Sequence, residues 1–245
     1  MNSDIREKIA SKDFQIPTRD GQLIPVRVYR PKSLPDKILL PVYLFFHGGG
    51  FLFGTLNSED ANCGRIVAAL NIIVVNVCYR HTPQFKHPTQ ANDAWDAFQW
   101  VVNHFNTIGG DKNQLIVGGI SAGGGLAASV VLKENKTSIN QRRIKGQVLC
   151  IPQLFYSGAF PFHLLASNDV SSYCQHAHAP IIPRTRLDLF ETSLGVEDPD
   201  DMSLFVGNCA DRDVVGMSKT VFLVAGMDPL RDGALLYAEK LRRNK

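Results

Sequence analysis

A serine at the centre of a glycine-rich turn is the first feature of this 245-residue sequence that could do chemistry. Ser121 is the middle residue of segment 119–123, which has the pattern G-x-S-x-G. A β-prone run, 115–117, precedes it and a helix-competent run, 126–134, follows. A serine at a tight strand-to-helix turn takes a strained backbone conformation, and the two glycines let the neighbouring strand and helix approach. The pattern predicts an exposed, reactive hydroxyl, although a glycine-rich turn that carries a serine by chance also fits.

Three consecutive glycines follow another apolar run. Residues 38–46 are nearly all apolar, and the residues directly after them, 47–50, read H-G-G-G. Backbone N–H groups can converge on a developing negative oxygen only where no side chains intervene, so this segment predicts an oxyanion hole. A flexible glycine-rich loop is the alternative. Neither glycine-rich segment has the G-x-G-x-x-G pattern of dinucleotide-binding proteins, and the sequence has no Walker A pattern.

An aspartate follows a third apolar run. Asp228 comes shortly after residues 220–225. If 38–46, 115–117 and 220–225 are strands of one parallel sheet, the segments that follow them meet at its carboxyl edge. A serine, a glycine-rich loop and a carboxylate are therefore expected at the same edge of the sheet.

The order of apolar and amphipathic segments predicts the architecture that positions these residues. Apolar strands that alternate with helices are typical of an α/β protein with a mostly parallel sheet and helices on both faces. We expect one domain over residues 1–245, in which 156–215 form an irregular insertion or cap-like segment with two short helices. The expected strands are 38–46, 72–79, 115–117, 144–155 and 220–225 after a hairpin of 14–17 and 23–29, and the expected helices are 1–12, 57–69, 92–106, 126–134 and 234–243.

The composition limits the classes of function. The net charge of +3 is too small to indicate a nucleic-acid partner, and the N-terminus lacks the apolar core of a signal peptide. The longest apolar run, 38–46, is too short to span a membrane. The five cysteines include no C-x-x-C pair and are odd in number, which favours a reducing compartment, so we expect a cytoplasmic protein. Cys174, His176 and His178 have poor spacing for a metal site and lack an obvious fourth ligand.

These segments resemble the hormone-sensitive-lipase-like branch of the α/β-hydrolases (fold-3 type), a family of serine carboxylesterases. The combination of H-G-G-G, G-x-S-x-G and a later aspartate carries the resemblance. Residues 79–83 (Y-R-H-T-P), 93–95 (D-A-W) and 228–232 (D-P-L-R-D) also look like segments of that family. The similarity covers about residues 39–240, most of the chain.

The resemblance implies an α/β-hydrolase fold and a role for each matching residue. Ser121 would attack the carbonyl of a small acyl ester, and Asp228 would be the acid of the catalytic triad. No cofactor and no metal ion is implied. The oxyanion would be bound by the N–H groups of Gly48, Gly49 and Ala122, in a motif supported by His47 and Gly50.

The base of the triad is absent from its expected place. In this fold the histidine follows the aspartate along the chain, but none of the 17 residues after Asp228 is a histidine. The resemblance therefore implies a C-terminally short chain that lacks the family's last strand and histidine loop. We expect a feeble esterase or none, because losing the base costs on the order of 10⁶ in kcat. A truncated esterase, a natural pseudoenzyme and substitution by another histidine are the three explanations.

All seven histidines precede Asp228. His47 belongs to the oxyanion segment. Three others are expected to face solvent: His81, His87 and His104. The remaining three lie in the insertion, from which they could swing over the site: His163, His176 and His178.

Two further hypotheses belong to other classes of function. A catalytically inactive small-molecule-binding protein could use the same scaffold, as do the plant gibberellin receptors, which resemble this family and lack the triad histidine. A structural module with a glycine-rich turn is the other hypothesis. Without a following strand, residues 220–225 would also form an exposed apolar edge, which invites self-association.

Overall fold

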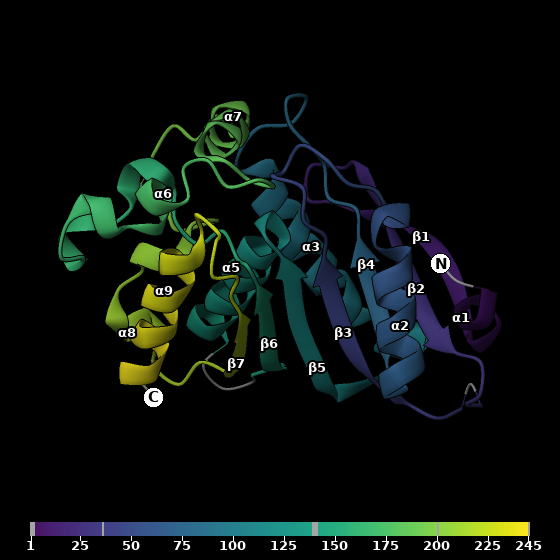
Figure 1. Cartoon of the computed structure of the whole chain (residues 1–245). Coiled ribbons are helices and arrows are strands. Elements are labelled where there is room, and N and C mark those ends of the chain that lie inside the picture. The colour runs from purple at the N-terminus through teal and green to yellow at the C-terminus, as the bar shows by residue number, and fades with distance from the viewer. Residues whose placement is uncertain (1–2, 36, 139–141, 200, 245) are drawn as a thin grey trace.

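A seven-stranded sheet forms the centre of the computed structural model, which describes residues 3–35, 37–138, 142–199 and 201–244 (Figure 1). The strand order is β1-β2-β4-β3-β5-β6-β7. The pairings of β1 with β2 and of β2 with β4 are antiparallel, and the others are parallel, which confirms the predicted sheet. The strands are β1 Ile9–Pro17, β2 Leu23–Pro31, β3 Leu40–Phe46, β4 Ile73–Val77, β5 Gly110–Ile120, β6 Ile144–Cys150 and β7 Lys219–Leu223.

Several element boundaries differ from the expectation: the strand expected over 115–117 and the helix expected over 126–134 are longer, and the described part of 156–215 contains three α-helices where two were expected. Two further differences have a clear local reason. The helix expected over 1–12 is shorter: α1 covers Ser3–Lys8, and β1 begins at Ile9 because this residue already pairs with β2. The strand expected over 144–155 ends at Cys150. The next residue, Ile151, has φ +40°, and this conformation cannot continue a strand.

Helices cover both faces of the sheet, but unequally. On one face α5 packs on β5 and β6, α3 packs on α5, and Tyr237 of α9 joins the same large core. On the other face α2 packs on β2 and β4 over a smaller core that includes Tyr29 and Tyr43. The bounds of the helices named here are α2 Asp60–Leu70, α3 Thr89–Asn103, α5 Ala122–Thr137 and α9 Arg231–Arg243. A short helix, α4 Phe105–Ile108, follows α3, and a 3-10 turn at Leu56–Glu59 precedes α2.

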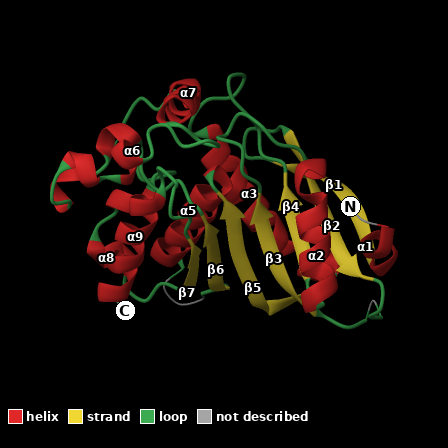
Figure 2. Cartoon of the chain, viewed as in Figure 1, coloured by secondary structure: helices red, strands yellow, loops and turns green. Residues whose placement is uncertain are grey.

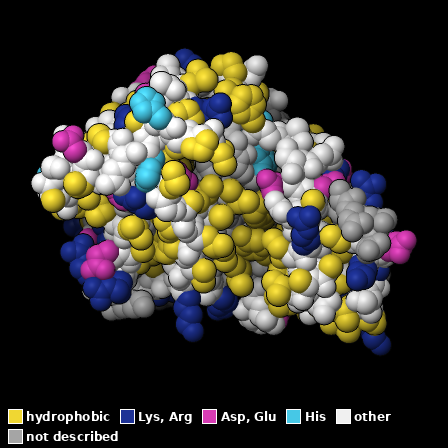
Figure 3. Space-filling view, viewed as in Figure 1, with side chains coloured by type: hydrophobic (Ala, Val, Ile, Leu, Met, Phe, Trp, Pro, Cys, Tyr) yellow, Lys and Arg dark blue, Asp and Glu magenta, His cyan; other side chains and the backbone are white. Residues whose placement is uncertain are grey.

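An apolar surface lies over β5, β6 and β7 on the less covered face. Val221 and Leu223 of β7 keep 56% and 49% of their surface exposed, and Ile116 of β5 is also exposed. Figure 3 shows the apolar side chains that gather there. Within the described residues β7 pairs only with β6, so it is an edge strand with an apolar exposed face.

Residues 156–215 contain short helices joined by irregular chain (Figure 2). Both α6 and α7 lie above the carboxyl ends of the strands, whereas α8 returns to pack against α9. Ser172 at the start of α6 donates its N–H to Asp232 Oδ2 (2.6 Å) and its hydroxyl to Pro229 O (2.6 Å), which ties this segment to the chain after β7. The elements are α6 Ser172–Gln175, α7 Arg184–Leu194 and α8 Asp211–Val214, with 3-10 turns at Ser157–Ala159, Phe162–Leu164, Asn168–Val170 and Val206–Asn208.

A buried ion pair holds the loop after β4. Arg80 Nη2 lies 2.6 Å from Asp93 Oδ1, and the Arg80 backbone N–H donates to Asp93 Oδ2 (2.9 Å). Asp93, in α3, is fully buried. The pair therefore joins two of the segments on which the family resemblance rests, 79–83 and 93–95.

The substitution Arg80→Met should lower the free energy of unfolding by about 3–5 kcal/mol, because it leaves the Asp93 carboxylate buried without its cation. Arg242→Met is the control, since it removes an exposed pair with Glu239 and should leave the free energy of unfolding nearly unchanged. Urea unfolding measures both. Equally small effects would show that water replaces the guanidinium at Asp93.

Candidate active site

Ser121 lies at the sharp turn between β5 and α5. Its backbone has φ +54° and ψ −118°, a strained conformation for a residue with a side chain. A Cβ at Gly119 or Gly123 would come within 3.0 Å of the Phe46 carbonyl oxygen, and at Gly123 also of the His47 carbonyl oxygen. The end of β3 thus runs so close to the turn that only glycine fits at these two positions. The predicted strand, turn and helix around Ser121 are present.

Backbone hydrogen bonds hold Ser121 from the side of β6. The Ser121 N–H donates to Cys150 O (2.8 Å), and the Gln153 N–H donates to Ser121 O (3.1 Å). The Ser121 side chain is half-buried, and its hydroxyl makes no hydrogen bond to any residue that the structure describes. The backbone is therefore fixed while the hydroxyl remains available to a ligand.

The glycine-rich segment after β3 lies against this turn. A Cβ at Gly48 would be 3.1 Å from the carbonyl oxygen of Ile120, the residue before the serine. Gly49 and Gly50 have φ +127° and +62°, which favour glycine. The N–H groups of residues 52 and 53 close the turn by donating to Gly49 O (3.1 and 2.9 Å). The segment is thus an ordered turn and not a flexible loop.

The amides expected to bind an oxyanion are unpaired. Among the described residues, the N–H groups of Gly48, Gly49 and Ala122 have no hydrogen-bond acceptor. Ala122 is the first residue of α5, where unpaired N–H groups favour a negative charge. This arrangement can stabilise negative charge that develops on an oxygen beside Ser121.

His47 supports the glycine-rich segment from inside the protein. Its ring is fully buried, stacks on Tyr79 (4.4 Å between centroids) and donates from Nδ1 to Gly48 O (2.8 Å). The Tyr79 hydroxyl in turn donates to His47 O (2.9 Å). A Cβ at Gly54 would collide with the imidazole ring. Burial lowers the pKa of His47 to about 4, so the ring stays neutral near pH 7.

Asp228 lies between β7 and α9, with Oδ1 accepting a hydrogen bond from the Leu230 N–H (2.9 Å). Burial raises the pKa of this carboxyl group, while that hydrogen bond and the nearby His176 lower it. Burial, and next the negative charge of Asp228, raise the pKa of Cys150. Asp228 follows β7 as Ser121 follows β5, so both come after strands that run in parallel to the same edge of the sheet.

Three histidines expected to face solvent do not. His81, His87 and His104 are all half-buried. His87 Nε2 lies 2.7 Å from Asp201 Oδ2, and His104 donates from Nδ1 to Trp100 O (2.7 Å). The expectation was wrong because tertiary contacts, some with distant segments such as the one around Asp201, cover these loops.

The histidines of residues 156–215 do not reach the serine either. Arg231 Nη1 donates to His176 Nε2 (3.1 Å), which occupies the atom that a base needs to accept a proton. His163 and His178 are exposed. Among the described residues, no hydrogen bond joins a histidine to Ser121 or Asp228. The structure therefore brings the serine and the glycine-rich segment together, and no histidine of the described residues is hydrogen-bonded to the serine.

Sequence reasoning missed Glu191. This carboxylate lies on the buried side of α7 together with Leu187, Phe190 and Leu194. A single carboxylate within an apolar stripe of helical spacing was the signal that could have revealed it, because such a group needs buried partners.

Other kinds of site were sought across the described part of the chain. No group of three or more His, Cys, Asp or Glu side chains there is arranged to hold a metal ion. The described helices include none with the length and apolar character needed to cross a membrane. The five cysteines are free thiols.

Comparison with known proteins identifies the family. Residues 43–245 match the family described as the alpha/beta hydrolase fold, and the chain belongs to it. Esterase LipI of Mycobacterium tuberculosis is 32% identical over 225 residues, which are 91% of this chain and 67% of the relative. Ethyl acetate hydrolase of Pseudomonas putida is 29% identical over 242 residues, 94% of this chain and 69% of that protein.

Solved structures agree with the sequence relatives. The hyperthermophilic esterase of Pyrobaculum calidifontis has a TM-score of 0.84 at 29% identity, with coverage of 96% of this chain and 72% of that one. A thermostable esterase of Pseudomonas putida has a TM-score of 0.86 at 28% identity, covering 99% and 72%. The chain is thus a carboxylesterase-like serine hydrolase of the predicted hormone-sensitive-lipase-like branch. It spans about two thirds of the length of the curated relatives.

The low pKa of His47 predicts a loss of stability in acid. As the pH falls from 6.5 to 4, unfolded chains bind a proton at His47 that the folded protein does not bind. Stability present above pH 6.5 is therefore lost as the pH approaches 4, by up to about 3 kcal/mol.

His47→Asn removes this titrating ring, so the free energy of unfolding should depend less steeply on pH over this window. Urea unfolding at several pH values measures the slope. His178→Asn, which changes an exposed ring, should keep the wild-type slope. Identical slopes for the wild type and His47→Asn would contradict the assignment.

Proposed function

We propose that this chain carries the machinery of a serine carboxylester hydrolase for small acyl esters, with Ser121 as nucleophile and Asp228 as triad acid. The strained Ser121 backbone beside the unpaired N–H groups of Gly48 and Gly49 is the observation that carries the proposal. The names of the relatives, an esterase and an ethyl acetate hydrolase among them, support it.

In this proposal the Ser121 oxygen attacks the ester carbonyl carbon, and the carbonyl electron pair moves onto the oxygen. The N–H groups of Gly48, Gly49 and Ala122 bind that oxyanion. Its collapse breaks the bond to the alcohol and leaves the acyl group on Ser121, and water then repeats the attack and releases the acid. Each attack needs a base that accepts a proton and returns it to the leaving group, and Asp228 would orient an imidazole in this role.

We propose that the 245 residues, by themselves, are a slow esterase. No histidine follows Asp228, and none of those present is hydrogen-bonded to Ser121. Loss of the base costs on the order of 10⁶ in kcat, while oxyanion stabilisation and binding retain about 10³–10⁴ over water.

A catalytically inactive small-molecule-binding protein is the second candidate, and the free Ser121 hydroxyl without a base favours it. In either case we propose that residues 1–245 act as one domain and that 156–215 form its cap. The position of α6 and α7 above the carboxyl ends of the strands supports this role. We keep the cytoplasm as the expected location on the grounds of the cysteine usage.

Added imidazole should supply the missing base. With p-nitrophenyl butyrate and imidazole in the buffer, hydrolysis by the chain should exceed that by Ser121→Ala by on the order of tenfold, because a positioned base acts on the serine hydroxyl. Mass spectrometry should find one butyryl group on the chain and none on the variant. The variant also corrects for ester hydrolysis by imidazole alone.

Equal rates in both proteins, with no acylated chain, would rule out Ser121 as the nucleophile. Measurable binding of a non-hydrolysed ester analogue under the same conditions would then favour the binding protein.

We also propose that two copies associate through β7. Its edge, which pairs with no other strand of the described residues, and its exposed Val221 and Leu223 offer both backbone and apolar partners. Light scattering should find dimers or larger species, and Val221→Lys should shift the population to monomers. Leu235→Lys, at an exposed apolar position of α9, is the control and should not change the population. A wild-type protein that stays monomeric at high concentration would contradict the proposal.

A further inference from the structure

A cavity of about 290 Å³ opens between α3, α5 and the chain at residues 201–203. The two helices pack on each other, and the Ser129 hydroxyl of α5 donates to Ser203 O. Three segments that are far apart in the sequence therefore form its walls. Binding sites for small molecules begin at about this volume, so the cavity suits a small ligand.

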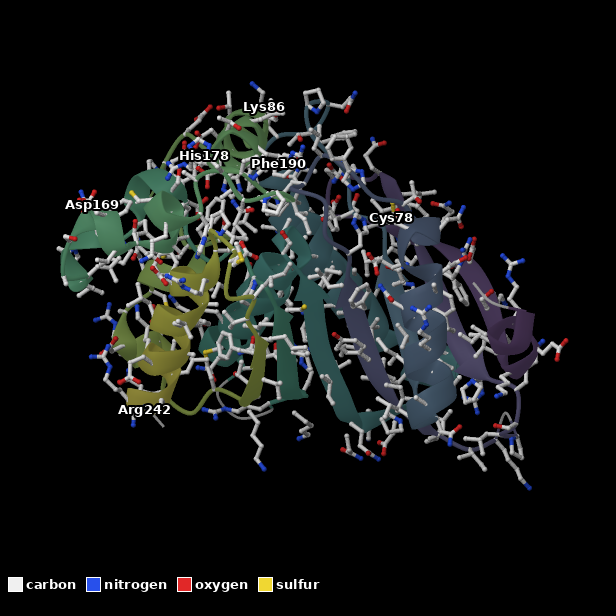
Figure 4. All side chains as sticks on the ribbon, viewed as in Figure 1. Cys78, Lys86, Asp169, His178, Phe190 and Arg242 are labelled. Atoms are coloured by element: carbon white, nitrogen blue, oxygen red, sulfur yellow. The ribbon has the colours of Figure 1, made fainter. Side chains whose placement is uncertain are left out.

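The cavity is separate from the candidate active site. Ser129, which lines it, lies about two turns along α5 from Ser121. Side chains at the carboxyl ends of the strands, such as Phe190 (Figure 4), are not among the residues that line the cavity. A ligand bound here would therefore occupy a second site of the molecule.

Most of the cavity wall is apolar. Ala91 of α3 and Val130 of α5 are buried core residues that reach it, and Met202 is half-buried at its edge. The indole of Trp95 forms another part of the wall and packs on Phe98, with 5.2 Å between the ring centroids. An apolar group that enters would leave water, which favours its binding.

A lysine stands at the cavity without a counter-ion among the described residues. Lys133 Nζ lies 4.5 Å from the centroid of the Trp95 ring, so a cation–π contact supports the ammonium. Within the described part of the chain, the Lys133 side chain makes no ion pair and donates no hydrogen bond. Its N–H groups are therefore available to an acceptor on a ligand.

The acidic side chains around Lys133 each have another partner: Asp201 is paired with His87, Asp213 with Lys136, and Asp96 with Arg19. Partial burial lowers the pKa of Lys133, followed by the charge of Arg19, whereas Asp96 raises it. An anion at this ammonium favours its charged form and so acts against both of the lowering effects. The cavity thus favours a negatively charged group beside Lys133.

We propose that this cavity binds a small organic carboxylate with an apolar body, of about the size of a benzoate ion. Lys133 donates to the carboxylate, and the body lies against Val130, Met202 and the indole of Trp95. Both parts of the ligand are needed, because an inorganic anion leaves the apolar wall uncovered and a neutral ring leaves the ammonium without a counter-ion. The inference does not depend on the proposed esterase activity.

NMR titration of the indole N–H signals tests the site, since the chain has only two tryptophans. Trp95 lines the cavity, whereas Trp100 stacks on His104, with 4.7 Å between the ring centroids, and is the internal reference. The variant Trp95→Phe assigns the two signals. Benzoate should shift the Trp95 signal saturably.

Two further probes separate the charge of the ligand from its apolar body. Benzamide has the shape of benzoate without the charge, and it should bind about fivefold more weakly, as the loss of a partly exposed ion pair predicts. Acetate has the charge without the ring, and it should bind at least about tenfold more weakly, because it buries little apolar surface.

Lys133→Met keeps an apolar side chain but removes the ammonium, so benzoate and benzamide should bind it with equal affinity. The residue is on the exposed side of α5, and the variant should fold. Lys12→Met is the matched control. Lys12 is also an exposed lysine over an aromatic ring, 5.1 Å from the Phe14 centroid, but it does not line the cavity, so the preference for benzoate should remain.

Equal affinities of the wild-type protein for benzoate and benzamide, or a preference that survives Lys133→Met, would overturn the inference. Acetate that binds as tightly as benzoate would also overturn it, because it would show pairing with a surface lysine alone. So would a shift confined to Trp100, or no saturable shift. None of these outcomes involves ester turnover, so they are distinct from the result of the esterase assay.

Discussion

Close packing between the end of β3 and the turn after β5 is the constraint on which the site depends. Phe46 pairs with Gly119 in the parallel ladder, so β3 and β5 end at the same level. The Phe46 carbonyl then presses against the space that a Cβ at Gly119 or Gly123 would fill. This contact holds Ser121 in its strained backbone conformation, since a relaxed turn would separate the two strands. The same geometry brings Gly48 against Ile120, the residue before the serine.

Buried polar groups keep the glycine-rich segment in a single shape. Three glycines in a row have large conformational freedom, which must be removed for their amides to converge on one point. His47 and Tyr79 restrict the backbone of the segment through hydrogen bonds to its carbonyl groups. The Arg80–Asp93 pair fixes the next loop. In a water-poor interior such bonds are strong, and leaving one partner unpaired is costly. The shape of the oxyanion segment is therefore set by residues that are not themselves placed to touch an ester.

The sheet is covered unevenly, and the difference is visible at the carboxyl edge of the strands and at the edge strand β7. Above the carboxyl edge, α7 is tied to the chain after β6 by Glu191, and the same Gln153 that donates to Glu191 also donates to the carbonyl of Ser121. At β7 the sheet presents an apolar face and an unpaired edge among the described residues. The second feature leaves an apolar surface that is favourable to cover.

The sequence by itself determined the fold class, the turn at Ser121 and the glycine-rich segment, because these depend on local rules. Apolar runs define buried strands, and a glycine two residues either side of a serine identifies a crowded turn. The tertiary structure decided the features that depend on contacts between residues far apart in the sequence. His87 is covered because Asp201 folds over it, and β6 ends at Cys150 because Ile151 turns away. Trp95, Lys133 and Ser203 line one cavity only because α3 and α5 pack together beside a segment far away in the sequence. Contacts of this kind depend on the packing of whole elements, and no short stretch of sequence encodes them.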